Sequence, residues 1–345
     1  METENSTAAV SQRAIGITSG WLVSPAFDLC FLANLWWPLV FLVGALAGET
    51  DSWFGFWQIY FLTTPHRWLT LLLVATDRDR RAGKTTWLVT IALVAAVALV
   101  SVFVWRGELI CLALIDYLWN AWHFGSQHGG IARIYARKQG ARSTIWQTWG
   151  LRLLVVYTAM RMAGWMTSWL EADRFGTDLL YLGDLVVGST CSLFAVAPLL
   201  QNRKVRSAWS IYVLSVVAIY DLLLLAVNCR ARGSIVALVG ASAAFHAVEY
   251  MAFVTFYAKQ RTSQGSAGLF VSMAQRWLAL LLIYITLLGA AALFADRTWQ
   301  DIWLGINLWA AFVHYAFDGL IWKLRERRTS ETLNIDLPST SKGAT

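Results

Sequence analysis

Residues 85–105 read TTWLVTIALVAAVALVSVFVW, an unbroken apolar run without a charged side chain. A helix rises about 1.5 Å per residue, so a run of this length covers the roughly 30 Å hydrocarbon core of a bilayer. Other runs of about 20 residues or more recur along the chain between short charged breaks. The sequence therefore predicts an all-α fold, a polytopic transmembrane helical bundle.

The composition also indicates a chain that lies in lipid. Of the 345 residues, 57% are hydrophobic and 14% are charged, whereas a soluble domain needs more charge to cover its surface. Strands of a membrane barrel would alternate apolar and polar residues over about 10 positions, and no segment does so. The net charge of +7 comes from lysines and arginines that fall in interhelical loops, so we expect no nucleic-acid partner.

About ten spans are expected. They lie near residues 25–48, 53–76, 84–105, 108–134, 145–170, 178–200, 208–228, 233–257, 276–295 and 299–323. The chain then divides into a cytoplasmic N-terminal segment (1–20), a transmembrane helical domain (21–323) and a disordered cytoplasmic tail (324–345). The polar first segment has no basic n-region and no cleavage site, so no secretory signal is expected.

Loop charge predicts the orientation. Basic loops follow every even-numbered span, as in DRDRRAGK (77–84) and KLRERR (323–328). The other loops carry less net positive charge, although NCRAR (228–232) is an exception. By the positive-inside rule both termini lie in the cytoplasm, and we expect a multi-pass protein of the cell (inner) membrane.

All five histidines fall at one predicted depth. They lie on the second, fourth, eighth and tenth spans, about 7–12 residues from the cytoplasmic end, which is about 10–18 Å at the helical rise. They are His66, His123, His128, His246 and His314. Glu249 lies three residues after His246, and Asp318 four after His314, so each pair shares a helix face.

Such a layer of ionisable groups is expensive in a membrane. Each costs at least a few kcal/mol to insert, whereas an interhelical hydrogen bond returns only about 0.6–2 kcal/mol. Interhelical hydrogen bonding stays open as an explanation, but five histidines with adjacent carboxylates favour a functional site facing the bundle interior.

Imidazoles and carboxylates are ligands of iron, zinc, manganese and copper. Iron–sulfur chemistry is not expected, because Cys30, Cys111, Cys191 and Cys229 form no Cys-x-x-Cys pair. We expect non-haem iron, as a single ion or a di-iron pair, with zinc or haem as alternatives. The preferred ligands are His66, His123, His246 and His314, and the second choices are Glu249, Asp318 and His128.

Other roles follow from residue type and position. The candidate catalytic residues are Glu249, Asp318, Tyr250, Tyr315 and Arg152. The candidate cofactor-binding residues are Asn120, Gln127 and His128. The tyrosines can donate protons, and Arg152 can meet an anionic headgroup or pair with a buried carboxylate. A site this deep below a cytoplasmic opening favours a hydrophobic lipid or isoprenoid substrate.

Histidines on several helices near the cytoplasmic face resemble the plan of membrane-bound non-haem iron oxygenases and desaturases. The plan is also similar to that of the bacterial Brp/Blh family of carotene-cleaving enzymes, which are polytopic and His-dependent. The resemblance implies iron, dioxygen chemistry and an electron-donor protein. The His-x-x-His-His and His-x-x-x-His boxes of desaturases are absent, and the closest pair is His123-x-x-x-x-His128.

The sequence therefore predicts a metal-dependent membrane oxidoreductase acting on a lipid or isoprenoid. Three alternatives stay open: a zinc-dependent membrane hydrolase, a haem-binding electron carrier and a proton-coupled transporter. The bound metal separates the two enzymes, a visible absorption spectrum detects haem, and pH-dependent flux without metal would indicate transport.

Overall fold

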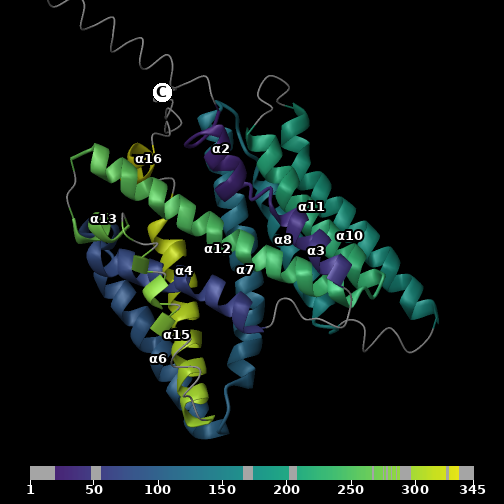
Figure 1. Cartoon of the computed structure of the whole chain (residues 1–345), viewed down its shortest axis with the longest axis horizontal. Helices are drawn as coiled ribbons and strands as arrows, with labels where there is room; N and C mark the ends of the chain where they lie inside the picture. Colours follow the sequence, from purple (N-terminus) through teal and green to yellow (C-terminus); the bar gives the residue numbers. More distant parts are fainter. Residues whose placement is uncertain are drawn as a thin grey trace, which may run out of the picture. The chain divides into compact units, whose positions relative to one another are not determined.

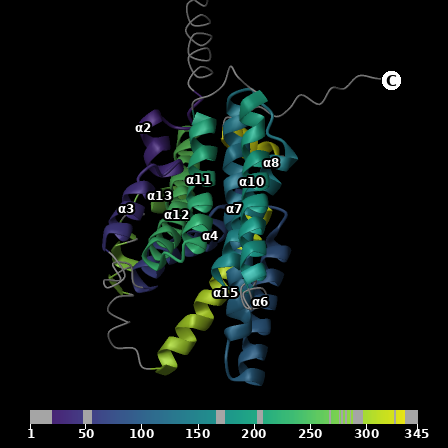
Figure 2. The same ribbon diagram turned by 90° about the vertical axis from the view of Figure 1, so that its right-hand side faces the viewer.

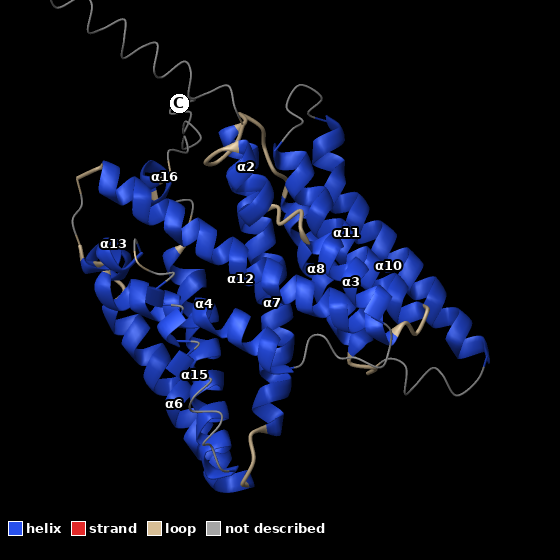
Figure 3. Cartoon of the chain, in the orientation of Figure 1, coloured by secondary structure: helices blue, strands red, loops and turns tan. Residues whose placement is uncertain are grey.

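A computed structural model describes residues 20–47, 56–165, 174–201, 208–265, 268–274, 276, 279–280, 282–284, 286–287, 297–323 and 326–333. The described part of the chain consists of helices joined by loops and contains no strand, as the sequence predicts (Figure 3). It divides into two compact units. Unit 1 consists of the described residues of Met1–Asp51 and Phe124–Phe245, and unit 2 of those of Ser52–His123 and His246–Asn334.

Unit 1 begins with a short helical segment, α2 (Pro25–Phe27) and the π-helical η1 (Asp28–Leu32), followed by α3 (Trp37–Ala47). Its other helices are α8 (Ile145–Met162), α10 (Arg174–Gln201) and α11 (Ala208–Asn228). It also contains the second part of α7 (Ile110–Lys138) and the first part of α12 (Arg232–Ser263).

Helices α8, α10 and α11 lie side by side (Figures 1 and 2). A Cβ atom on Gly150 of α8 would lie 2.6 Å from the Cys191 carbonyl of α10, so only glycine permits this approach. Arg161 of α8 and Asp184 of α10 form an ion pair: Nε and one terminal nitrogen of Arg161 lie 2.7 and 2.9 Å from the two carboxylate oxygens. Tyr157 adds a 2.7 Å hydrogen bond to Asp184, which completes a buried polar link.

Unit 2 contains α4 (Phe56–Thr76), α5 (Arg78–Arg81), α6 (Thr85–Arg106) and the first part of α7. Its later elements are the second part of α12, α13 (Leu269–Ala274), α15 (Arg297–Ile321) and α16 (Arg327–Thr332). Helix α15 packs against α4 and α6 (Figure 1). The buried core between these helices includes Leu73, Val254, Tyr257, Val313 and Phe317.

Among the described residues, five helices are long and apolar enough to cross a membrane. Their limits are Thr85–Arg106, Leu179–Leu200, Ala208–Asn228, Arg232–Ser263 and Ile302–Ile321. Only 11% of the most apolar window of α6 is buried, and its outward face carries large side chains such as Val104 and Trp105. Because water would penalise so much exposed apolar surface, these helices are consistent with an integral membrane protein.

The first predicted span, 25–48, is not one straight helix. Its two halves, Pro25–Leu32 and Trp37–Gly44, meet at an angle of 40°. Asn34 lies in the break with a left-handed backbone (φ 47°), a conformation that ends a right-handed helix. Its side-chain amide donates to the Phe245 carbonyl at 3.3 Å, which fixes the break. Most of the ninth predicted span, 276–295, lies outside the described residues.

Candidate metal centre

Four of the five histidines come together in unit 2. Each is carried by a different helix: His66 by α4, His123 by α7, His246 by α12 and His314 by α15. All four side chains are buried, with at most 7% of any residue exposed. The sequence predicts that these residues share one depth, and the fold turns them toward one another.

The four imidazoles form a closed ring of edge-to-face contacts. His66 lies beside His246 and His314, with 4.8 Å between ring centroids in each pair. The ring centroid of His123 lies 5.0 Å from that of His246 and 4.7 Å from that of His314, which completes the ring of four. We name these four residues the histidine cluster. Each imidazole of the cluster contacts two of the other three.

The ring nitrogens of His66 and His314 are oriented by oxygen partners. The Nδ1 of His66 lies against the Thr63 carbonyl, which can only accept, so this nitrogen carries the proton and Nε2 keeps its lone pair. His314 Nδ1 lies 2.7 Å from the Thr70 hydroxyl. His314 Nε2 is buried and has no hydrogen-bond partner within the described residues. Metal-binding histidines show this arrangement, in which the second ring nitrogen is held by an oxygen.

Asp318 extends the cluster with a carboxylate. Its Oδ1 accepts hydrogen bonds from Tyr250 at 2.9 Å and Thr70 at 3.3 Å. Its Oδ2 lies 3.8 Å from His123 Nε2 and 3.8 Å from His314 Nδ1. One oxygen is therefore held by hydroxyl donors while the other faces the imidazoles.

These side chains make two groups of ligand atoms, each within 4.8 Å of one another: His66, His246 and His314, and His123, His314 and Asp318. The Nε2 atoms of His66 and His246 are 3.2 Å apart. Two nitrogens bound at about 2.0–2.1 Å to one ion at angles near 90–109° would be separated by about 2.9–3.4 Å. The observed spacing fits one shared ion, and it also fits a direct hydrogen bond in which His246 donates.

Other predicted site residues of unit 2 lie around the cluster. Glu249 is fully buried on α12 but belongs to neither group of ligand atoms. The Tyr315 hydroxyl lies 2.9 Å from Asn120 Oδ1 and 2.9 Å from Asp116 Oδ1, and its ring centroid is 4.8 Å from that of His123. Asn120 is thus placed beside a tyrosine that packs on the cluster.

Three predicted residues lie in unit 1 and belong to neither group. His128 is buried, and its Nδ1 lies 3.0 Å from the Tyr212 hydroxyl. Gln127, its neighbour on α7, is half-buried. Arg152 donates from Nε to the Ser126 hydroxyl at 2.9 Å, and its guanidinium lies 5.7 Å from the Trp149 ring centroid.

Sequence reasoning missed two residues of the site, Thr70 and Asp116. Thr70 contacts His314, Asp318 and Tyr250, and the Tyr315 hydroxyl reaches Asp116. Both lie at helical spacing from a histidine, as Glu249 and Asp318 do. Thr70 is four residues after His66, and Asp116 is seven before His123, so each lies on a histidine-bearing face. The signal was present in the sequence.

The comparisons with known proteins assign no family to this site. No protein-family model, curated protein or solved structure matches the chain.

Proposed function

We propose that the chain is a metal-dependent integral-membrane oxidoreductase, of the oxygenase, hydroxylase or desaturase type, that acts on a lipid or isoprenoid. The observation that carries this proposal is the group His123, His314 and Asp318. Two imidazoles and one carboxylate with open positions are the ligand set of non-haem iron oxygenases. His66 and His246 add nitrogen donors beside this group, enough for a single ion or a di-iron pair.

The surroundings of the cluster support a hydrophobic substrate. The four histidines are buried in a unit whose helices α6, α12 and α15 are each apolar enough to span a membrane. A hydrocarbon chain reaches such a position from lipid without losing hydration, whereas a sugar or nucleotide would lose its hydrogen bonds to water.

The reaction class implies a partner. Hydroxylation or desaturation by dioxygen consumes two electrons and two protons beyond those of the substrate bond, so an electron-donor protein is required. Tyr250 is placed to pass a proton, because its hydroxyl donates to Asp318 at 2.9 Å.

The expected topology of ten spans, with both termini in the cytoplasm of the inner membrane, belongs to the same proposal. Its support comes from three predicted cytoplasmic loops that meet in unit 2. Lys84 Nζ lies 2.8 Å from Glu326, and Arg261 lies 2.6 Å from Asp79. The ends of the second, eighth and tenth predicted spans thus lie on one side, as the positive-inside rule requires.

A zinc-dependent hydrolase is the second candidate, and a separate observation favours it. The group His66, His246 and His314 has three imidazoles, a donor set of catalytic zinc with its fourth position open for water. Asp318, next to His314 on the same helix face, can serve as general base.

The arrangement speaks against a haem held between two of these histidines. Iron between two imidazoles separates their nitrogens by about 4 Å with a flat macrocycle between them. His66 and His246 approach to 3.2 Å between Nε2 atoms, while His314 packs against His66 and His123 packs against His246.

The identity and amount of bound metal test this proposal. We expect purified protein to carry iron at about one or two ions per chain, as measured by elemental analysis. The iron-loaded protein, supplied with reductant, dioxygen and a total lipid extract, should yield lipids whose mass has gained one oxygen or lost two hydrogens. Stoichiometric zinc would favour the hydrolase instead, and protein that takes up neither metal would eliminate both enzymes.

Thr70→Val should lower the affinity of the site for its metal without removing a metal ligand. The substitution keeps the shape of the side chain but deletes the hydroxyl that holds His314 Nδ1. Loss of such a partner typically costs about 10–100-fold in metal affinity, which chelator competition measures. Thr158→Val is the matched control, because Thr158 is equally buried and its hydroxyl bonds only within α8, to the Leu154 carbonyl. Equal chelator midpoints in both variants would contradict the role of Thr70.

A further inference from the structure

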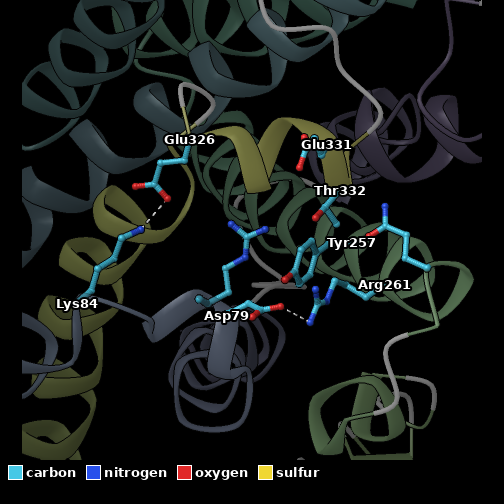
Figure 4. Close-up of a pocket in the computed structure, with 9 residues that line it drawn as sticks. Asp79, Lys84, Tyr257, Arg261, Glu326, Glu331 and Thr332 are labelled. Carbon is cyan, nitrogen blue, oxygen red and sulfur yellow. Dashed lines mark hydrogen bonds and ion pairs between the residues drawn. The ribbon is translucent and has the colours of Figure 1, made fainter.

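Unit 2 contains a polar pocket of about 330 Å³ that is distinct from the histidine cluster. Figure 4 shows labelled residues of its lining, among them Lys84 facing Glu326 and Arg261 facing Asp79. These two contacts, at 2.8 and 2.6 Å, neutralise both cations with carboxylates of the same lining. The lining has two further charged residues, Glu331 and Arg80, and no ion pair joins them within the described residues.

Arg80 is a buried guanidinium without a carboxylate partner among the described residues. The residue is 5% exposed and lines the pocket. One terminal nitrogen donates to the Ile321 carbonyl at 2.9 Å and to the Thr329 hydroxyl at 2.8 Å. Its Nε is buried and has no hydrogen-bond partner in the described part of the chain. A buried charge of this kind is costly unless an anion compensates it.

Two aromatic rings hold the guanidinium in place. Its carbon lies 4.4 Å from the Tyr257 ring centroid and 4.8 Å from that of Trp322. Contacts with ring faces favour the cation but satisfy none of its hydrogen-bond donors. Arg80 lines the cavity with its guanidinium already positioned, and a guanidinium held in this way is suited to recognise phosphate.

The position of the pocket indicates where the anion comes from. Three candidate membrane helices end next to it: α6 begins at Thr85, α12 ends at Ser263 and α15 ends at Ile321. The ends of spanning helices lie in the headgroup layer of a bilayer. A phosphate in this pocket would therefore be at the depth of lipid phosphates.

We propose that this pocket binds the phosphate group of a phospholipid, with Arg80 as its principal contact. The proposal does not depend on the metal centre, since Arg80 belongs to neither group of metal-ligand atoms. A free phosphate shares the recognised chemistry, so the test compares a lipid source with a soluble one.

The test measures binding to purified protein in detergent by calorimetry, with dioctanoyl phosphatidic acid, inorganic phosphate and dioctanoylglycerol as probes. We expect saturable binding of the phosphatidic acid, displacement by inorganic phosphate and no binding of dioctanoylglycerol. Arg80→Gln should weaken binding about 10- to 100-fold, the usual worth of a charge-assisted hydrogen bond. Arg78→Gln, the same charge change at an exposed position two residues earlier, should leave it unchanged.

Inorganic phosphate bound as tightly as the lipid, and lost in Arg80→Gln, would support the phosphate site with a soluble ligand. Equal losses in both arginine variants, or equal binding of dioctanoylglycerol, would overturn the proposal. If Arg80→Gln does not fold, wild-type protein decides: inorganic phosphate must displace the phosphatidic acid. Metal content measured on the same samples should be equal in Arg80→Gln and wild type, which separates this test from that of the metal centre.

Discussion

Replacing His314 with alanine is expected to abolish stoichiometric metal binding. His314 belongs to both groups of ligand atoms, and its buried Nε2 has no hydrogen-bond partner within the described residues. Its loss removes one donor from either arrangement and leaves the Thr70 hydroxyl without its ring partner. We expect metal content below about a tenth of the wild-type value, since two remaining ligands hold a transition metal weakly.

His128→Ala is the matched control for this experiment. His128 is as buried as the cluster histidines, yet it belongs to unit 1 and contacts Tyr212. The variant should elute like wild type and keep its metal. Full metal content in His314→Ala, or equal loss in His128→Ala, would show that the histidine cluster is not the metal site.

Asp184→Ala should cause the largest loss of stability among single substitutions in unit 1. Asp184 and Arg161 form a two-bond ion pair with side chains only 3% and 4% exposed. Removing the carboxylate takes away the counter-charge that Asp184 supplies to a buried guanidinium, and breaking one partner of a buried pair typically costs about 3–5 kcal/mol. Denaturant unfolding in micelles, followed by helical circular dichroism, measures the change.

Two further variants distinguish this mechanism from a general effect of losing charge. Asp79→Ala breaks the exposed contact with Arg261 and should cost at most about 1 kcal/mol, because solvent screens that pair. The double variant Arg161→Met with Asp184→Leu should recover most of the stability, because no unpaired charge remains. A double variant as unstable as Asp184→Ala would contradict this explanation.

The helices are predictable from the sequence where apolar runs are long and uniform. The run at 208–228 was predicted with the bounds of α11, and 84–105 is one residue from α6. In both, every turn is apolar and a charged or polar break marks the ends. Hydrogen bonding within the helix and exclusion from water then act on the same residues, so local sequence suffices.

Prediction is weaker where a single residue overrides an apolar run. The run at 25–48 predicts one helix, but Asn34 takes a left-handed conformation and its amide bonds to the Phe245 carbonyl. That carbonyl is 211 residues away in the chain. No local pattern contains the partner that makes the break favourable.

For the site, too, some residues are predictable from the sequence and others are not. Spacing on single helices correctly paired His314 with Asp318 and would also have found Thr70 beside His66. Spacing also placed Glu249 and His128 with the other candidates, although neither belongs to a group of ligand atoms. His128 follows His123 by five residues, which turns it by about 140° around α7.

By itself, the sequence determined that this protein is helical and that its apolar helices suit a membrane. These properties are one-dimensional, because length, hydropathy and helical rise set them. Only the tertiary structure decided which imidazoles face one another, that Thr70 contacts His314, and that Arg80 lines a pocket without a carboxylate partner within the described residues. Those outcomes depend on how each helix is rotated about its axis, and packing against other helices sets that rotation.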